Sequence, residues 1–152
     1  MRTCSYEVTA RSAAPPERVF DLLADATSWP RWAGLPIAHG SWEREGEPAP
    51  RGVGAIRKVG RWPMFGREQV VASEPPSHHA YTMLSGNPVR HYRADVLLAP
   101  DGVGTSITWS ATFEPLIPGT GRLFERIYQR LIGSFARRLA AYAEQPTNRR
   151  HE

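Results

Sequence analysis

The sequence predicts an α+β fold, in which a curved antiparallel sheet of about seven strands wraps around a long C-terminal helix. Three patterns support this prediction: apolar and polar residues alternate near the N-terminus, short strand-like segments punctuated by Gly and Pro occupy residues 38–113, and an apolar stripe at helical spacing follows them. A long helix with one apolar stripe needs an apolar surface to lie against, and a sheet with one solvated face supplies it.

The N-terminal segment is predicted to form one strand and two helices. Residues 3–12 alternate in the manner of a half-buried strand, with Tyr6, Val8 and Ala10 on one face. Prolines at 15 and 16 stand where a helix can begin, and the apolar spacing after them predicts a helix of about ten residues. Capping oxygens at 25–28 precede Trp-Pro-Arg-Trp at 29–32, which predicts a short helical turn ending near Gly34.

The middle of the chain is predicted to be an antiparallel meander, because turn-forming residues separate its short segments. The last of these segments is the clearest, since Ile107, Trp109, Ala111 and Phe113 face one way and Ser and Thr residues face the other. The predicted strands lie at about 39–46, 53–60, 65–74, 78–85, 89–99 and 104–114.

The C-terminal segment is predicted to be one helix of about six turns, from near Leu123 to Tyr142. Gln145 and Pro146 end it, and the polar, arginine-rich residues 146–152 are expected to be a disordered tail. We therefore expect one domain over residues 1–145. A sheet wrapped around a helix rarely contacts it everywhere, so an internal cavity is expected.

Composition argues against several classes of protein. With 41% hydrophobic and 22% charged residues in 152, usage is that of an ordinary globular domain. The start shows no signal peptide and no stretch approaches the roughly 20 apolar residues of a membrane span, so a cytoplasmic protein without stable membrane insertion is expected. Cys4 is the only cysteine, which excludes an internal disulfide and favours an unreactive thiol in a strand.

The net charge of +4 does not predict a nucleic-acid partner, because the arginines are scattered beside acids instead of lining one run. The histidines also lack metal-ligand spacing with a second histidine, cysteine or carboxylate on a shared face. We therefore expect neither a metal site nor a cofactor.

Three segments carry a resemblance to a known family: YEVTARSAAPPERVFDLLADATSWPRW at 6–32, REQVVASEPPSHHAYTM at 67–83 and NPVRHYRADVLLAPDGVGTSITWSATFEPLIPGTG at 87–121. Together with the order of elements, they resemble the START-like (SRPBCC) superfamily, and within it bacterial proteins of the polyketide cyclase/dehydrase type. The resemblance covers about residues 3–144. It implies a helix-grip fold around a deep hydrophobic cavity that takes lipids, sterols, polyketides or related aromatic compounds.

The resemblance supplies no catalytic motif that could be transferred to this chain. We therefore expect a protein that binds or carries a hydrophobic small molecule. Two alternatives stay open: a cyclase/dehydrase-type enzyme that uses general acid–base chemistry, and a protein-interaction module. A homodimer is also left open.

The expected ligand contacts are aromatic or apolar side chains on the helix stripe, on the short N-terminal helices and on the inner face of the sheet. They are Trp29, Trp32, Tyr81, Met83, Tyr92, Trp109, Phe124, Tyr128, Leu131 and Phe135.

Catalysis would need a proton acceptor and a donor inside the cavity. If Tyr92 faces inward, simple alternation puts Arg90 on the same face, and His79 and Tyr81 share the inner face one strand earlier. These four residues are weak candidates, because tyrosines and histidines at strand ends are commonly rim residues.

Two further features of the strands are left open by the sequence. An inward Arg57 or Arg67 would need a carboxylate or an anionic ligand, and the glycines at 54 and 66 leave the parity of their strands uncertain. The apolar loop at 61–65 could close a cavity, contact a membrane or pack in a dimer.

Overall fold

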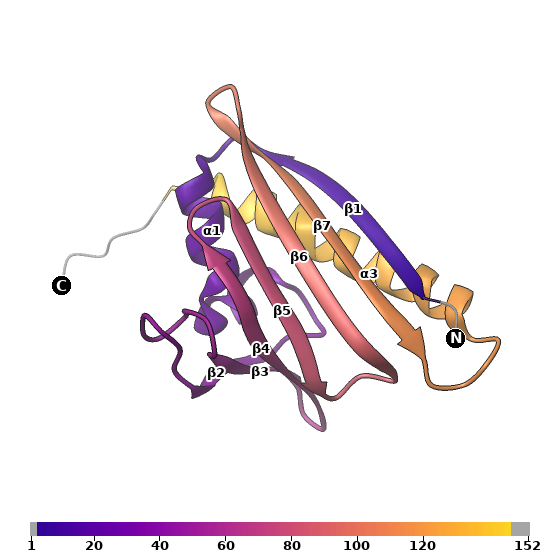
Figure 1. Cartoon of the computed structure of the whole chain (residues 1–152). Helices are drawn as coiled ribbons and strands as arrows, with labels where there is room; N and C mark the ends of the chain where they lie inside the picture. The colour runs from indigo at the N-terminus through magenta and orange to yellow at the C-terminus, as the bar shows by residue number, and fades with distance from the viewer. Residues whose placement is uncertain (1–2, 147–152) are drawn as a thin grey trace.

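The computed structural model describes residues 3–146, which form a curved sheet with a long helix behind it (Figure 1). The predicted α+β fold is therefore confirmed. The elements are β1 (Cys4–Ser12), α1 (Pro16–Ala24), the 3-10 turn η1 (Ala26–Ser28), α2 (Trp29–Trp32), β2 (His39–Arg44), β3 (Ile56–Arg61), β4 (Met64–Glu74), β5 (His78–Ser85), β6 (Val89–Asp101), β7 (Gly104–Pro115) and α3 (Gly121–Ala143).

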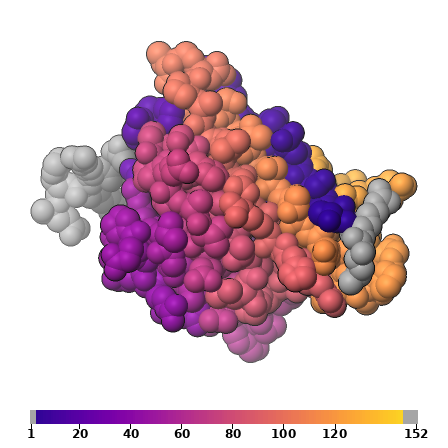
Figure 2. Space-filling model, in the orientation of Figure 1, coloured from indigo at the N-terminus to yellow at the C-terminus, as the bar shows by residue number. Residues whose placement is uncertain are grey.

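The seven strands form one antiparallel sheet in the order β1-β7-β6-β5-β4-β3-β2. Strands β2 to β7 pair with their neighbours in sequence, as short turns favour, whereas β1 pairs with β7 from Cys4 opposite Phe113 to Ser12 opposite Thr105. The outer face of this sheet is a continuous surface over β4 to β7 and β1 (Figure 2).

Strand boundaries follow the predicted segments, with one clear difference at the start of β3. This strand begins at Ile56 and not at 53, because Gly54 has a φ of +92°, which an extended strand does not contain. The backbone of Gly54 still donates a hydrogen bond to the carbonyl of Val70 at 2.9 Å. The segment before β3 therefore stays attached to the neighbouring strand without belonging to the ladder.

The core lies between the concave face of the sheet and the helices. Alternation in β1 and β7 behaves as predicted, since Tyr6, Val8, Trp109 and Phe113 are buried while their sequence neighbours are more exposed. Helix α1 lies at one end of the sheet (Figure 1), and Phe20 and its apolar neighbours on this helix are buried. Burial of this continuous apolar surface is the main stabilising contribution.

The long helix packs unevenly along its length. Its C-terminal half is buried through residues such as Phe135 and Leu139, whereas Leu123 and Ile127 near its start are 57% and 44% exposed. The apolar stripe predicted for the whole helix is therefore covered only in part. Helix α3 packs mainly against β1, β7, α1 and α2, and much less against the inner surface of β3 to β5.

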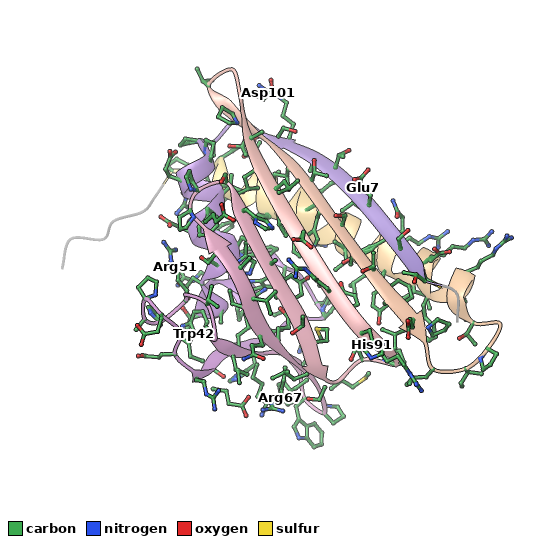
Figure 3. The ribbon with its side chains drawn as sticks, in the orientation of Figure 1. Glu7, Trp42, Arg51, Arg67, His91 and Asp101 are labelled. Carbon is green, nitrogen blue, oxygen red and sulfur yellow. The ribbon has the colours of Figure 1, made fainter. Side chains whose placement is uncertain are left out.

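The expected inward position of Arg90 is wrong. The ladder between β6 and β7 shifts between Arg90 and Arg93, and His91 has a φ of +54°, which marks a β-bulge. Because the bulge adds a residue, Val89 and Tyr92 face the core while Arg90 is exposed. His91 lies near the start of β6 (Figure 3), and its Nδ1 is 3.0 Å from Glu114 Oε2. The predicted disordered tail lies outside the described residues, except for Pro146.

Candidate functional site

A cavity of about 240 Å³ lies between α3 and the inner face of β3 to β6. It occupies the region that α3 leaves uncovered when it packs against β1 and β7. Aromatic and aliphatic side chains make most of its wall, together with Glu68 and Asn87. The lining residues are Trp29, Pro36, Ile37, Val59, Gly60, Met64, Phe65, Gly66, Glu68, Tyr81, Met83, Gly86, Asn87, Pro88, Tyr92, Tyr128, Leu131, Ile132 and Phe135.

The volume indicates the size of ligand that fits. Cavities of about 150 Å³ with apolar walls bind benzene, and pockets for drug-sized ligands occupy roughly 300–1,000 Å³. At about 240 Å³ the cavity lies between these two ranges. The cavity therefore has a volume in the range that holds a small ring compound.

Seven of the ten expected ligand contacts line this cavity: Trp29, Tyr81, Met83, Tyr92, Tyr128, Leu131 and Phe135. The other three lie behind the wall. The Trp32 ring packs 4.5 Å from that of Trp29, the Trp109 indole N–H donates to Tyr81 Oη at 3.2 Å, and Phe124 lies 6.2 Å from Tyr128. These aromatic residues hold the lining side chains in place.

Two of the four weak catalytic candidates, Tyr81 and Tyr92, line the cavity. Tyr92 Oη shares a short hydrogen bond with Tyr6 Oη, and Tyr81 Oη accepts from Trp109. Burial is the main cause that raises the pKa of Tyr6, Tyr81 and Tyr92 above the usual value. These phenols therefore stay protonated at neutral pH, so they can donate hydrogen bonds but cannot serve as bases.

A buried ion pair between Arg57 and Glu68 places a charged group at the cavity wall. The sequence did not predict this pair. Arg57 is fully buried and Glu68 is 7% exposed, and Arg57 Nε donates to Glu68 Oε1 at 2.8 Å. Arg57 Nη2 lies equally close to Oε1 but makes no well-aligned hydrogen bond. Arg57 Nη1 donates to the Leu23 carbonyl at 2.9 Å, and the guanidinium lies over the Trp29 and Tyr81 rings.

The open question about the two strand arginines is thereby answered. Arg57 points inward and has the carboxylate that such an arginine needs, whereas Arg67 pairs at 2.7 Å with Glu43 near the surface (Figure 3). One signal could have identified Glu68 beforehand: it stands two residues from the buried Val70 and therefore shares its face. The register that sets Arg57 directly opposite Glu68 could not be read from the sequence.

The remaining catalytic candidate, His79, is buried but does not line the cavity. Its ring lies 6.1 Å from Phe20 and 5.9 Å from Tyr81, and neither ring nitrogen has a hydrogen-bond partner among the described residues. Burial, followed by the positive charges of Arg57, His78 and Arg51, lowers its pKa well below the usual value. His79 is therefore a neutral core residue.

Replacing His79 with leucine should raise the free energy of unfolding at pH 7 by about 1–2 kcal/mol, because two unpaired buried polar atoms are removed. In the parent protein, His79 takes up a proton at a higher pH in the unfolded chain than in the folded protein, because burial lowers its pKa in the folded state. The free energy of unfolding should therefore fall as the pH drops through about 6.5, and this fall should be smaller in the variant. Urea titrations at pH 5 to 8 measure both effects. The exposed variant His39→Leu is the control, and a loss of stability in His79→Leu would contradict the prediction.

The cavity reaches the surface at the hairpin between β3 and β4, the apolar loop singled out in the sequence. Met64 lines the cavity and is 78% exposed, and Trp62 beside it is 81% exposed. Arg61 ties this hairpin to the segment after α2 by donating to the Leu35 carbonyl at 2.7 Å. The hairpin is therefore held beside that segment, which contributes Pro36 and Ile37 to the cavity lining.

Neither a group of metal ligands nor a membrane-spanning helix is found among the described residues, 3–146. Within this range no group of three or more His, Cys, Asp or Glu residues is placed to hold a metal ion. No helix in the same range is long and apolar enough to cross a membrane.

Comparison with known proteins finds a matching family, relatives in sequence and solved structures with a similar fold. The family described as "Polyketide cyclase / dehydrase and lipid transport" matches residues 3–144. Uncharacterised proteins of Mycobacterium bovis and Mycobacterium tuberculosis are 28% identical over 146 residues, which cover 91% of this chain and 84% of each relative.

Three solved structures share the fold. The protein XoxI of Bacillus cereus has a TM-score of 0.72 at 17% identity, over 98% of this chain and 99% of its own. Ara h 8.0201 has a TM-score of 0.70 at 18% identity, over 93% and 98%. A protein of Thermobifida fusca has a TM-score of 0.71 at 24% identity, over 92% and 89%. At these identities the likeness concerns the fold alone.

Proposed function

Because this chain belongs to the polyketide cyclase/dehydrase and lipid transport family, we propose that it binds and carries a hydrophobic small molecule in the cavity between α3 and the sheet. The observation that carries this proposal is the cavity itself. Its wall combines Trp29, Leu131 and Phe135 with other apolar side chains, so transfer of a ring compound from water into it is favourable.

The route into the cavity is proposed to pass the β3–β4 hairpin. Met64 connects the surface to the lining, and the exposed Trp62 offers a first apolar contact for an arriving ligand. The same exposed pair fits the interaction-module alternative. That alternative, however, expects a filled or very small cavity, and the volume of about 240 Å³ favours carriage.

Filling the cavity with a larger side chain tests the proposal. Leu131→Trp should lower the affinity for naphthalene by about tenfold or more, because an indole would occupy the volume that the probe needs. Leu123→Trp is the matched control, since position 123 lies on the same helix and is 57% exposed. Its affinity should equal that of the parent protein.

Affinity can be measured by the change in naphthalene fluorescence on titration with protein. Native mass spectrometry of the purified parent protein adds an independent readout, a retained small-molecule adduct. Equal affinities for Leu131→Trp and Leu123→Trp, with both variants folded by circular dichroism, would place binding elsewhere and refute the proposed site. Absence of any naphthalene binding by the parent protein would refute carriage in this cavity.

A cyclase/dehydrase-type enzyme is the second candidate, and Glu68 is the observation that favours it. General acid–base chemistry needs an acceptor and a donor near one ligand, and the cavity wall holds the Glu68 carboxylate together with the Tyr128 phenol. Conversion of the bound compound by the purified protein, abolished in Tyr128→Phe, would favour the enzyme over the carrier.

A further inference from the structure

We propose that the cavity selects an uncharged ring compound that carries a hydroxyl group, and that it excludes carboxylates such as free fatty acids. This inference rests on the proposed binding function and specifies its ligand class. It is carried by one polar atom on each of three wall residues, Glu68, Tyr128 and Asn87, because these atoms have no hydrogen-bond partner among residues 3–146.

The first of these atoms is a carboxylate oxygen of Glu68. Both contacts from Arg57 reach Oε1, and no hydrogen bond from a described residue reaches Oε2. Glu68 lines the cavity and is 7% exposed. Oε2 is not among the fully buried atoms without a partner, so it keeps some accessible surface, and an ionised carboxylate can only accept hydrogen bonds. The complementary ligand group is therefore a donor, as a hydroxyl is.

The other two atoms are donors from different elements. Tyr128 Oη on α3 and Asn87 Nδ2 in the β5–β6 turn are buried and lack partners within the described part of the chain, and both residues line the cavity. Burial raises the pKa of Tyr128 to about 12, so its phenol keeps its proton at neutral pH. A ligand hydroxyl satisfies both kinds of group, since it donates one proton and accepts through two lone pairs.

The charge at the wall also determines what is excluded. The Arg57 guanidinium already interacts with Glu68, the Leu23 carbonyl and two aromatic rings, so it has little capacity to bind a ligand anion. A ligand carboxylate would lose its hydration and lie near the Glu68 carboxylate in a water-poor space. The volume of about 240 Å³ also disfavours long acyl chains. Size and charge thus select the same class of small uncharged compound.

Three probes with the same two-ring skeleton test this inference: naphthalene, 2-naphthol and 2-naphthoate, titrated at pH 7 into the whole protein. 2-Naphthol should bind about tenfold more tightly than naphthalene, and 2-naphthoate should bind about tenfold more weakly. Tyr128→Phe should lower the affinity for 2-naphthol about fivefold more than it changes the affinity for naphthalene. Tyr142→Phe on the same helix, outside the cavity lining, is the matched control.

The variant Tyr128→Phe should fold with an unchanged or higher melting temperature, because its hydroxyl has no partner to lose. Glu68→Gln removes the negative charge and should restore binding of 2-naphthoate. If that variant does not fold, the three-probe comparison on the parent protein and the Tyr128→Phe titrations still test the inference. Equal affinity of the parent protein for naphthalene and 2-naphthol, or tightest binding of 2-naphthoate, overturns the inference and leaves carriage intact. Failure of naphthalene itself to bind would instead refute the proposed function.

Discussion

Replacing Glu68 with alanine should lower the free energy of unfolding by about 3–5 kcal/mol. The substitution leaves the Arg57 guanidinium fully buried without its carboxylate partner, and the Leu23 carbonyl and two aromatic rings cannot neutralise it. An uncompensated charge in the core is among the few causes of so large a loss from one substitution. Urea unfolding followed by tryptophan fluorescence measures it.

The matched control removes both charges. In Arg57→Met/Glu68→Leu no buried charge is left unpaired, and the Leu23 carbonyl keeps the hydrogen bond from the Trp29 indole N–H at 2.9 Å. This double variant should be close to the parent protein in stability or exceed it. A loss below about 1 kcal/mol in Glu68→Ala would mean that Arg57 finds water or another acceptor, contrary to its buried placement.

Replacing Trp109 with alanine should also lower the free energy of unfolding by about 3–5 kcal/mol. Trp109 is fully buried, its ring lies 6.0 Å from that of Trp29 and 6.5 Å from that of Phe135, and its indole N–H reaches Tyr81. The substitution leaves a void directly behind the cavity wall. Besides losing stability, the variant should therefore accept a ring compound larger than naphthalene.

Thermal unfolding and titration with anthracene measure the two effects on Trp109→Ala. Leu97→Ala is the control, because Leu97 is half exposed on the neighbouring β6 strand, and its effect should stay within about 0.5 kcal/mol. A small loss of stability with no gain in anthracene binding would show that the surrounding aromatic residues collapse into the void. Trp109 would then not support the wall as described.

The fold could be predicted from the sequence because its signals are local. Alternation in β1 and β7, proline before α1, and the apolar spacing of α3 each act over one element, and the resemblance to a family agreed with them. The family match over residues 3–144 confirms that resemblance. The single-domain boundary and the disordered tail at residues 146–152 remain predictions.

The site could be predicted only in part, and its errors have physical causes. Seven expected contacts line the cavity, because alternation correctly places Tyr81, Met83 and Tyr92 inside and helical spacing places Tyr128 and Phe135 there. Arg90 was misplaced because the bulge at His91 changes the parity of β6. Trp32, Trp109 and Phe124 face the core behind the wall, a distinction that hydrophobicity does not carry.

The sequence by itself determined the order of elements, the sheet, the long helix and the family, since periodicity and turn residues act over short stretches of chain. Only the tertiary structure decided where the cavity lies and what charge it contains. The cavity exists because α3 packs against β1 and β7, and its carboxylate lies at the wall because strand register sets Glu68 opposite Arg57. Both depend on contacts between segments far apart in the chain, which no local pattern encodes.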